Sequence, residues 1–179
     1  MSPPASPAPP PVRGFAPLLG PDPRILVLGS MPSVASLAAG QYYAHPRNVF
    51  WRIWGEIGGF DSTLPYAERV ARLTASGIAV WDVVASCVRS GSLDTAIAAD
   101  TIVPNPIAAL LAREHSIVRV VFNGAAAQAF FTRHVRAEIR REDLIFVRAP
   151  STSPAHAGVT FAEKLACWRA VVAPALSPP

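Results

Sequence analysis

The sequence predicts an α/β fold: a three-layer α/β/α sandwich around a short, mostly parallel central sheet. Short apolar runs typical of buried strands alternate with longer segments of helical pattern, and strands separated by helices favour a parallel sheet covered on both faces. Of the 179 residues, 51% are hydrophobic, which is enough to fill such a core. A chain of this length suggests one domain.

The two ends of the chain differ from its middle in composition. The first segment is almost entirely proline, alanine and serine, and the last residues are similar. Because such segments cannot build a core, we expect a disordered tail over 1–13 and a flexible C-terminus over 175–179. The single domain is then expected over 14–174.

The order of the elements follows from the apolar patterns. Apolar runs, the first of them RILVLG, predict strands at 24–29, 77–84, 118–122 and 144–147. Helical patterns predict helices at 48–57, 65–76, 106–115, 125–137 and 159–172. Ligands of parallel sheets bind beyond the carboxyl ends of the strands. The segments that follow the strands, 29–32, 85–87, 123–124 and 150–156, are therefore expected to converge on one crevice.

Charge and cysteine content narrow the class of protein. The net charge of +4 suits a polyanionic partner. Nearly all basic residues are arginine, which binds phosphate bidentately, although genomic base composition produces the same bias. The only lysine, Lys164, is expected on the surface of the last helix.

Two distant cysteines, Cys87 and Cys167, indicate no disulfide framework and a cytoplasmic location. We expect no metal and no cofactor, because no ligand spacing exists, and no membrane span, because no apolar run is long enough.

A polar and aromatic segment follows the first strand. Core packing does not demand its composition, which suits base stacking and hydrogen bonding. The alternative is a tyrosine-rich loop that packs on the next helix, with Asn48 as the N-cap of that helix. Composition alone leaves both interpretations open. The residues concerned are Gln41, Tyr42, Tyr43, His45, Arg47 and Asn48.

Three further segments carry candidate polar groups. The amide of Asn123 either meets a ligand edge or satisfies the backbone of a strand-to-helix turn. The stretch 150–156, PSTSPAH, is either a rigid turn for phosphate contact or an ordinary capped turn. Asp82 lies inside a strand pattern and needs a partner there. Cys87 is expected to be a packed small residue rather than a nucleophile.

Together these segments resemble the uracil-DNA glycosylase superfamily, and within it most closely the hypoxanthine-DNA glycosylase branch. The similarity runs from about residue 24 to 168. It rests on GSMPS at 29–33, GQYYAHP at 40–46 and NVFW at 48–51, and also on WDV at 81–83, ASC at 85–87, GSLD at 91–94 and STSPAH at 151–156.

The resemblance implies roles for particular residues. Tyr43 stands where relatives stack an aromatic ring on a flipped base, and Asn48 matches a catalytic asparagine. Ser30 stands where many relatives place a carboxylate or amide that positions water, and Ser151 where they place His or Asn. The base-binding residues are then Tyr43, Met31, Pro32, Asn123 and Ser86, with Asn48 and Ser30 as the catalytic pair. The expected DNA contacts are His45, Arg47, Ser151, Ser153, Pro154, Ala155 and His156.

The implied function is that of a monofunctional DNA-repair glycosylase. It would flip hypoxanthine out of damaged DNA and hydrolyse the bond to deoxyribose, acting as a monomer. A Schiff-base mechanism would need an amine near the sugar, which Lys164 is not expected to supply. The alternatives are a uracil or thymine mismatch glycosylase of the same fold and a nucleic-acid-binding module without activity.

Overall fold

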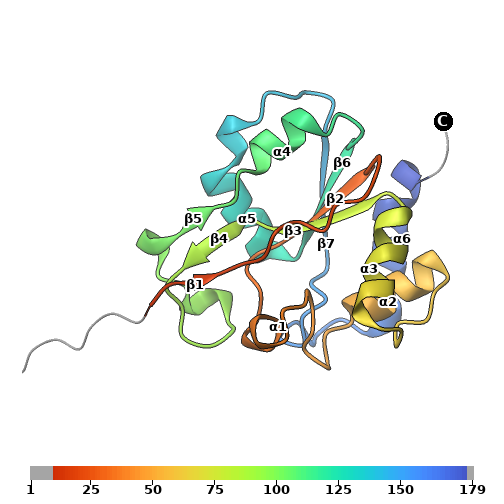
Figure 1. The fold of residues 1–179 in the computed structure, drawn as a ribbon, viewed down its shortest axis with the longest axis horizontal. Coiled ribbons are helices and arrows are strands. Elements are labelled where there is room, and N and C mark those ends of the chain that lie inside the picture. The colour runs from red at the N-terminus through yellow and green to blue at the C-terminus, as the bar shows by residue number, and fades with distance from the viewer. Residues whose placement is uncertain (1–9, 177–179) are drawn as a thin grey trace, which may run out of the picture.

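The computed structural model describes residues 10–176 and contains a central parallel sheet of four strands (Figure 1). These strands are β2 (Ile25–Gly29), β3 (Ile78–Asp82), β6 (Arg119–Asn123) and β7 (Ile145–Ala149), in the order β3-β2-β6-β7. The register is regular: Val27, for example, pairs with Val80 on one side and with Val121 on the other. All four strands therefore end at the same edge.

Helices cover both faces of this sheet. Alternate residues of β2 point to opposite faces of the sheet. On one face, Ile25 and Val27 pack with α2 (Phe50–Gly58), α3 (Tyr66–Ala75) and α6 (Phe161–Leu176). On the other face, Leu26 and Leu28 pack with α4 (Ile107–Arg113) and α5 (Ala125–His134). Figure 1 shows the two groups of helices on opposite sides. The predicted three-layer α/β/α fold is confirmed.

A second, antiparallel sheet was not predicted. It consists of β1 (Val12–Arg13), β4 (Val84–Cys87) and β5 (Val103–Pro104) in the order β1-β4-β5. The expected strand 77–84 in fact ends at Asp82, and β4 begins two residues later in the other sheet. Val12 pairs with Cys87 and packs beside Met31 and Val84.

The ordered domain is longer at both ends than expected. The tail assignment is wrong for residues 12–13, because backbone pairing with β4 holds them. It is also wrong for residues 175–176, because α6 continues to Leu176 and buries Ala175 against the core. The rest of the expected tails, 1–9 and 177–179, lies outside the described residues.

The remaining elements are short. Helix α1 (Val34–Ala39) lies in the segment expected to be a loop; the Ser33 hydroxyl caps its start, and Gly40 ends it at a φ of 62°. Three single turns of 3-10 helix occur at Asp94–Ala96, Ala99–Thr101 and Arg136–Glu138. Within residues 10–176, no helix combines the length and the hydropathy that crossing a membrane requires.

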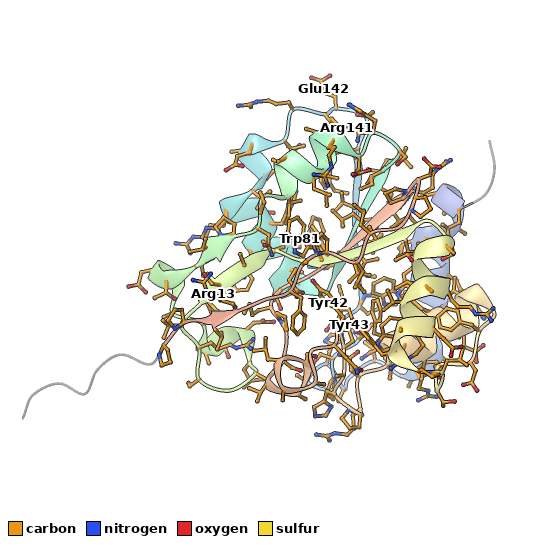
Figure 2. All side chains as sticks on the ribbon, in the orientation of Figure 1. Arg13, Tyr42, Tyr43, Trp81, Arg141 and Glu142 are labelled. Carbon is orange, nitrogen blue, oxygen red and sulfur yellow. The ribbon has the colours of Figure 1, made fainter. Side chains whose placement is uncertain are left out.

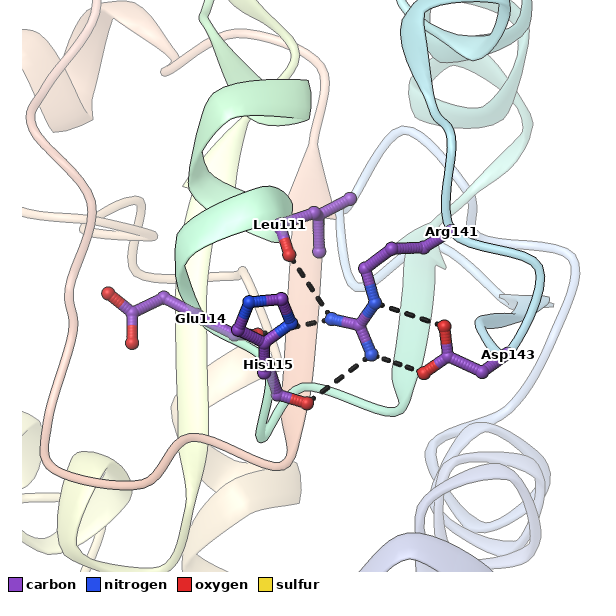
Figure 3. Close-up of polar contacts among 5 residues, drawn as sticks. All are labelled: Leu111, Glu114, His115, Arg141 and Asp143. Atoms are coloured by element: carbon purple, nitrogen blue, oxygen red, sulfur yellow. Dashed lines mark hydrogen bonds and ion pairs between the residues drawn. The ribbon is translucent and has the colours of Figure 1, made fainter.

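One arginine ties the end of α4 to the segment before β7 (Figure 3). Its guanidinium donates to the carbonyl oxygens of Leu111, Glu114 and His115 and pairs with the carboxylate of Asp143. This residue, Arg141, thus binds carbonyls at a helix C-terminus, where the last carbonyls have no partner within the helix. Figure 2 places Arg141 and Glu142 at the end of the molecule away from Tyr42 and Tyr43.

Arg141→Ala should lower the free energy of unfolding by about 1–3 kcal/mol, because several charge-assisted hydrogen bonds are lost together. Urea unfolding at neutral pH measures this. Arg140→Ala is the matched control, since Arg140 is exposed and donates only to the nearby Ala137 carbonyl. Equal stabilities of the two variants would show that the Arg141 contacts are not stabilising.

Candidate active site

A cleft of about 490 Å³ opens at the carboxyl ends of the central strands. Three of the four segments expected to converge there do so, namely 29–32, 123–124 and 151–156. The fourth, 85–87, runs away from the cleft in β4. The lining residues are Gly29 to Ser33, Ser36, Tyr42, Tyr43, Asn48, Asp82, Ser92 to Thr95, Asn123 to Ala126, Ser151 to Ser153, Ala155 and His156.

The last residue of β2, Gly29, lets two polar side chains approach the backbone. A Cβ atom at this position would lie 2.2 Å from Oδ1 of Asp82 and 3.0 Å from the Tyr43 hydroxyl. Any side chain would therefore displace one of them. The absence of a side chain at Gly29 brings a carboxyl group and a phenol together at the floor of the cleft.

Tyr43 forms an aromatic platform. Its ring stacks on that of Phe50, with centroids 3.9 Å apart and planes 15° from parallel, and its φ of 55° is unusual for a residue other than glycine. Its hydroxyl is buried and makes no hydrogen bond of good geometry with any described residue. Burial and then the charge of Asp82 raise the pKa of this hydroxyl, while the nearby Asn123 amide, which favours the ionised form by a weak hydrogen-bonding contact, lowers it. Tyr43 therefore remains a neutral phenol.

Of the two interpretations of Asn48 that the sequence left open, the N-cap is wrong, because Val49 is the N-cap residue of α2 and makes no side-chain cap bond. Oδ1 of Asn48 accepts a hydrogen bond from the backbone of Phe50, 3.0 Å away, at the first residue of α2. This contact closes an Asx turn just before the helix. It also fixes the amide so that Nδ2, which has no partner among the described residues, remains as a donor at the cleft.

Ser30 is linked to a carboxylate that is distant in sequence. Its hydroxyl donates to Oδ1 of Asp94 over 2.7 Å. Burial raises the pKa of Asp94, and the Ser30 hydrogen bond and Arg89 act in the opposite direction. Arg89 itself is buried and donates to the carbonyl of Pro32, so it supports the segment 29–32 from behind.

Asn123 is committed to Thr152 through both ends of its amide. Nδ2 donates to the Thr152 hydroxyl, and Oδ1 accepts from the Thr152 backbone, each over 2.9 Å. One N–H and one lone pair of the amide are not used by Thr152, and the amide also lies near the Tyr43 hydroxyl. The structure thus favours a positioning role, close to the backbone-satisfying alternative considered for Asn123.

The turn that follows β7 is built from local hydrogen bonds and anchored to α6. The Ser151 hydroxyl accepts from the backbone of Ser153, whose own hydroxyl accepts from Ala155. The Lys164 ammonium donates to the His156 carbonyl over 2.8 Å. The expectation of a solvated Lys164 is therefore wrong: only 5% of its surface is exposed, because it supports this turn.

Other expected site residues lie apart from the cleft. Ser86 sits in β4, opposite Arg13 and Val103, so its assignment to base binding is wrong. Met31 and Pro32 do line the cleft, whereas His45, Arg47 and Pro154 do not.

The sequence interpretation missed several residues of the cleft. Thr152 is buried and bonded to Asn123, and Ser36 accepts from the backbone of Ala44. Asp82 was noticed only as a strand residue in need of a partner, and Asp94 was assigned no role. Leu93 is 59% exposed at the rim of the cleft. Within residues 10–176, no group of three or more potential ligand side chains is arranged to hold a metal ion.

These features define an α/β domain whose sheet edge forms an aromatic and amide-lined cleft of the size that takes a small ring system. The family model of the uracil DNA glycosylase superfamily matches residues 16–172. The chain therefore belongs to the uracil DNA glycosylase superfamily, and it is a DNA glycosylase.

Individual relatives are similar over most of their length. A hypoxanthine DNA glycosylase of Methanosarcina barkeri (strain Fusaro / DSM 804) is 37% identical over 113 residues, which cover 63% of this chain and 70% of the relative. A hypoxanthine DNA glycosylase of Methanosarcina acetivorans is 35% identical over 116 residues, which cover 64% of this chain and 72% of that relative. The solution NMR structure of a candidate uracil DNA glycosylase from M. acetivorans superposes with a TM-score of 0.75 at 30% identity, covering 90% of this chain and 96% of that one.

Asn48→Ser should separate the two roles of Asn48. Serine keeps a side-chain oxygen that can accept from the backbone of Phe50, so stability should hardly change, whereas loss of the amide donor should slow base excision about 10²-fold. Single-turnover cleavage and thermal melting measure the two effects. Asn48→Ala should lose the activity and also about 1 kcal/mol of stability, because the hydrogen bond to Phe50 is lost. Full activity of Asn48→Ser would leave Asn48 with the role of holding this turn alone.

Tyr43→Ala should weaken binding to DNA that carries the damaged base by about 1–3 kcal/mol, the usual contribution of base–aromatic stacking. Fluorescence anisotropy with lesion-containing and undamaged oligonucleotides measures it. Tyr43→Phe keeps the ring and should retain more of the lesion affinity. An equal loss of affinity for both oligonucleotides would mean that Tyr43 holds the loop rather than the base.

Proposed function

We propose that this protein releases hypoxanthine from deoxyinosine in DNA by hydrolysing the N-glycosidic bond. The observation that carries the proposal is the platform of Tyr43 on Phe50, with polar groups unpartnered beside it. A purine has a larger π-face than uracil and gains more from such a platform. The volume of the cleft is within the range that encloses small ring systems. The names of the two relatives from Methanosarcina agree with this substrate.

The cleft supplies the contacts that a flipped nucleotide needs. Tyr43 stacks on the base, and backbone groups of 30–32 together with the remaining N–H of Asn123 meet its edge. The Nδ2 donor of Asn48 holds the base or the attacking water, and Ser30 lies next to that water. Cleavage of the glycosidic bond proceeds through an oxocarbenium-like sugar, so fixed dipoles that stabilise the departing base lower the barrier.

The turn 151–156 and the rim supply the DNA contacts. The Ser151 and Ser153 hydroxyls and the exposed Ala155 and His156 line the mouth of the cleft. Arg47 is exposed and His45 half-exposed in the loop before α2, where they reach phosphates outside the cleft, and Pro154 stiffens the turn. The apolar side chain of Leu93 fills the space that the flipped base leaves in the stack.

The reaction leaves the DNA strand intact. The only lysine is buried and hydrogen-bonded to the His156 carbonyl, which supports hydrolysis by water over a Schiff base on the protein. All groups to which this proposal gives a role belong to the same chain, so the proposed reaction needs no second copy. DNA as the partner of a DNA glycosylase supports a cytoplasmic location.

Deoxyinosine should be cleaved faster than deoxyuridine. Single-turnover assays on oligonucleotides that differ only in the lesion measure both rates, with alkali added afterwards to reveal abasic sites. Strand breaks should need the alkali, and an undamaged oligonucleotide is the control. Faster release of uracil would move the enzyme to the mismatch-uracil specificity, and breaks without alkali would contradict monofunctional chemistry.

A further inference from the structure

Two carboxyl groups line the cleft, and neither belongs to the segment in which relatives carry the residue that positions water. Asp82 ends β3, and Asp94 begins a 3-10 turn twelve residues later. Both approach the first residues after β2: the carboxyl of Asp82 faces Gly29, and that of Asp94 is bonded to Ser30. The serine found where a carboxylate or amide was expected is therefore not isolated from acidic groups.

Asp94 is suited to accept a proton through Ser30. The Ser30 hydroxyl donates its only hydrogen to Asp94, so its oxygen can accept a hydrogen bond from a water molecule in the cleft. Burial raises the pKa of Asp94, and the hydrogen bond from Ser30 opposes that rise by stabilising the ionised carboxylate. A proton from the water passes to Ser30 as the serine hydrogen passes to Asp94.

Asp82 is suited to the opposite task. Only 3% of its surface is exposed, and its Oδ2 is buried without a partner among the described residues. An unpaired buried carboxylate is costly, whereas a neutral carboxyl group carries a hydrogen that it can donate. The Tyr43 hydroxyl, also unpartnered, lies beside the same point at Gly29. Asp82 thus presents a donor next to the platform on which the base stacks.

We propose that Asp82 and Asp94 act as an acid and base pair in hydrolysis of the N-glycosidic bond: Asp94, through Ser30, takes a proton from the attacking water, and Asp82 gives a proton to the departing purine. This inference rests on the proposed function and deepens it. Asp82 and Ser30 touch the reactants and are catalytic residues in this scheme, whereas Asp94 acts through Ser30.

The step balances without a further reactant. The water oxygen forms a bond to C1′ as the bond from C1′ to N9 breaks, and the electron pair of that bond stays with the purine. N7 of the purine takes the Asp82 proton, so neutral hypoxanthine leaves. The water loses one proton to Ser30, and the serine proton moves to Asp94. Afterwards Asp94 returns a proton to solvent and Asp82 regains one.

The surroundings of the two carboxyl groups set the pKa at which each loses its proton. Burial, and then the charge of Asp94, raise the pKa of Asp82 to about 7, while Arg89 lowers it. The other titratable groups that Asp82 faces, Tyr42 and Tyr43, stay neutral because burial raises their pKa values further. Glycoside-cleaving enzymes assign acid and base roles by this kind of environmental difference between carboxyl groups.

The test is single-turnover release of hypoxanthine from a deoxyinosine oligonucleotide between about pH 5 and about 9, a range chosen to bracket the titration of Asp82. The wild-type rate should fall as pH rises through about 7, because Asp82 then loses its proton. Asp82→Asn should be about 10²-fold slower at pH 6 and lack this fall. Ser30→Ala should be slower but keep the fall. Asp94→Asn should also be slower, and its fall should move to lower pH, because the charge of Asp94 raises the pKa of Asp82.

Two comparisons distinguish the proposal from a structural role. Because Ser30 and Asp94 form one relay, the double variant should be about as slow as either single variant. Asp100→Asn, a change in an exposed aspartate, should leave the rate unchanged. If the rate losses of the Ser30 and Asp94 variants added in the double variant, the proposed relay would be wrong. If the rate of Asp82→Asn still fell near pH 7, Asp82 would not be the acid.

Stability gives a readout that does not need activity. A folded Asp82 with a pKa near 7 keeps a proton that the unfolded chain, with a pKa near 3.8, has lost. The Asp82 contribution is therefore fully present below the lower value and is lost as pH rises toward 7. Asp82→Asn should lose this part of the pH dependence of thermal melting, and an identical dependence in both proteins would show Asp82 ionised in the fold. A wild-type protein that releases no hypoxanthine would instead contradict the proposed function itself.

Discussion

The two hydrogen bonds between the Asn123 amide and Thr152 hold together the parts that make the cleft. Asn123 is the last residue of β6, and Thr152 lies just beyond β7. The carbonyl of Thr152 also accepts from the backbone of Val49, next to the start of α2. The ends of two strands and the start of a helix on one face of the sheet therefore meet at one buried side chain.

This junction leaves no room at its centre. Gly124 has a φ of 95°, and a Cβ there would lie 2.8 Å from the Cβ of Ser151. The position therefore requires glycine, because the turn after β7 crosses it at close range. Phe50, which supports Tyr43, begins the helix that Thr152 and Asn48 hold. The aromatic platform of Tyr43 and the turn after β7 are thus placed relative to each other by the same few contacts.

The sequence was informative where local pattern determines structure. Five-residue strands that are mainly apolar and helices of two or three turns show a recognisable hydrophobic pattern, and the rule for parallel sheets then locates the cleft. Two-residue strands such as β1 have no period, so the second sheet was missed and Ser86 was misplaced. The bond from Ser30 to Asp94 spans 64 residues, and the Lys164 contact joins α6 to a loop; neither leaves a local signal.

The cleft departs from the rule that buried polar groups find partners. Within residues 10–176, the Tyr43 hydroxyl and Oδ2 of Asp82 have no hydrogen-bond partner of good geometry, and both side chains lie close to Gly29. Such groups lower stability in the free protein, and binding sites commonly tolerate this cost because a ligand supplies the missing contact. If the cleft takes a flipped base, as proposed, a base that offers no polar atom there would leave the two groups unpaired and desolvated, which would penalise it more than a missing apolar contact. In that proposal the polar floor beside the aromatic platform would discriminate between bases by the atoms on their edges, whereas the platform alone would discriminate only by ring size.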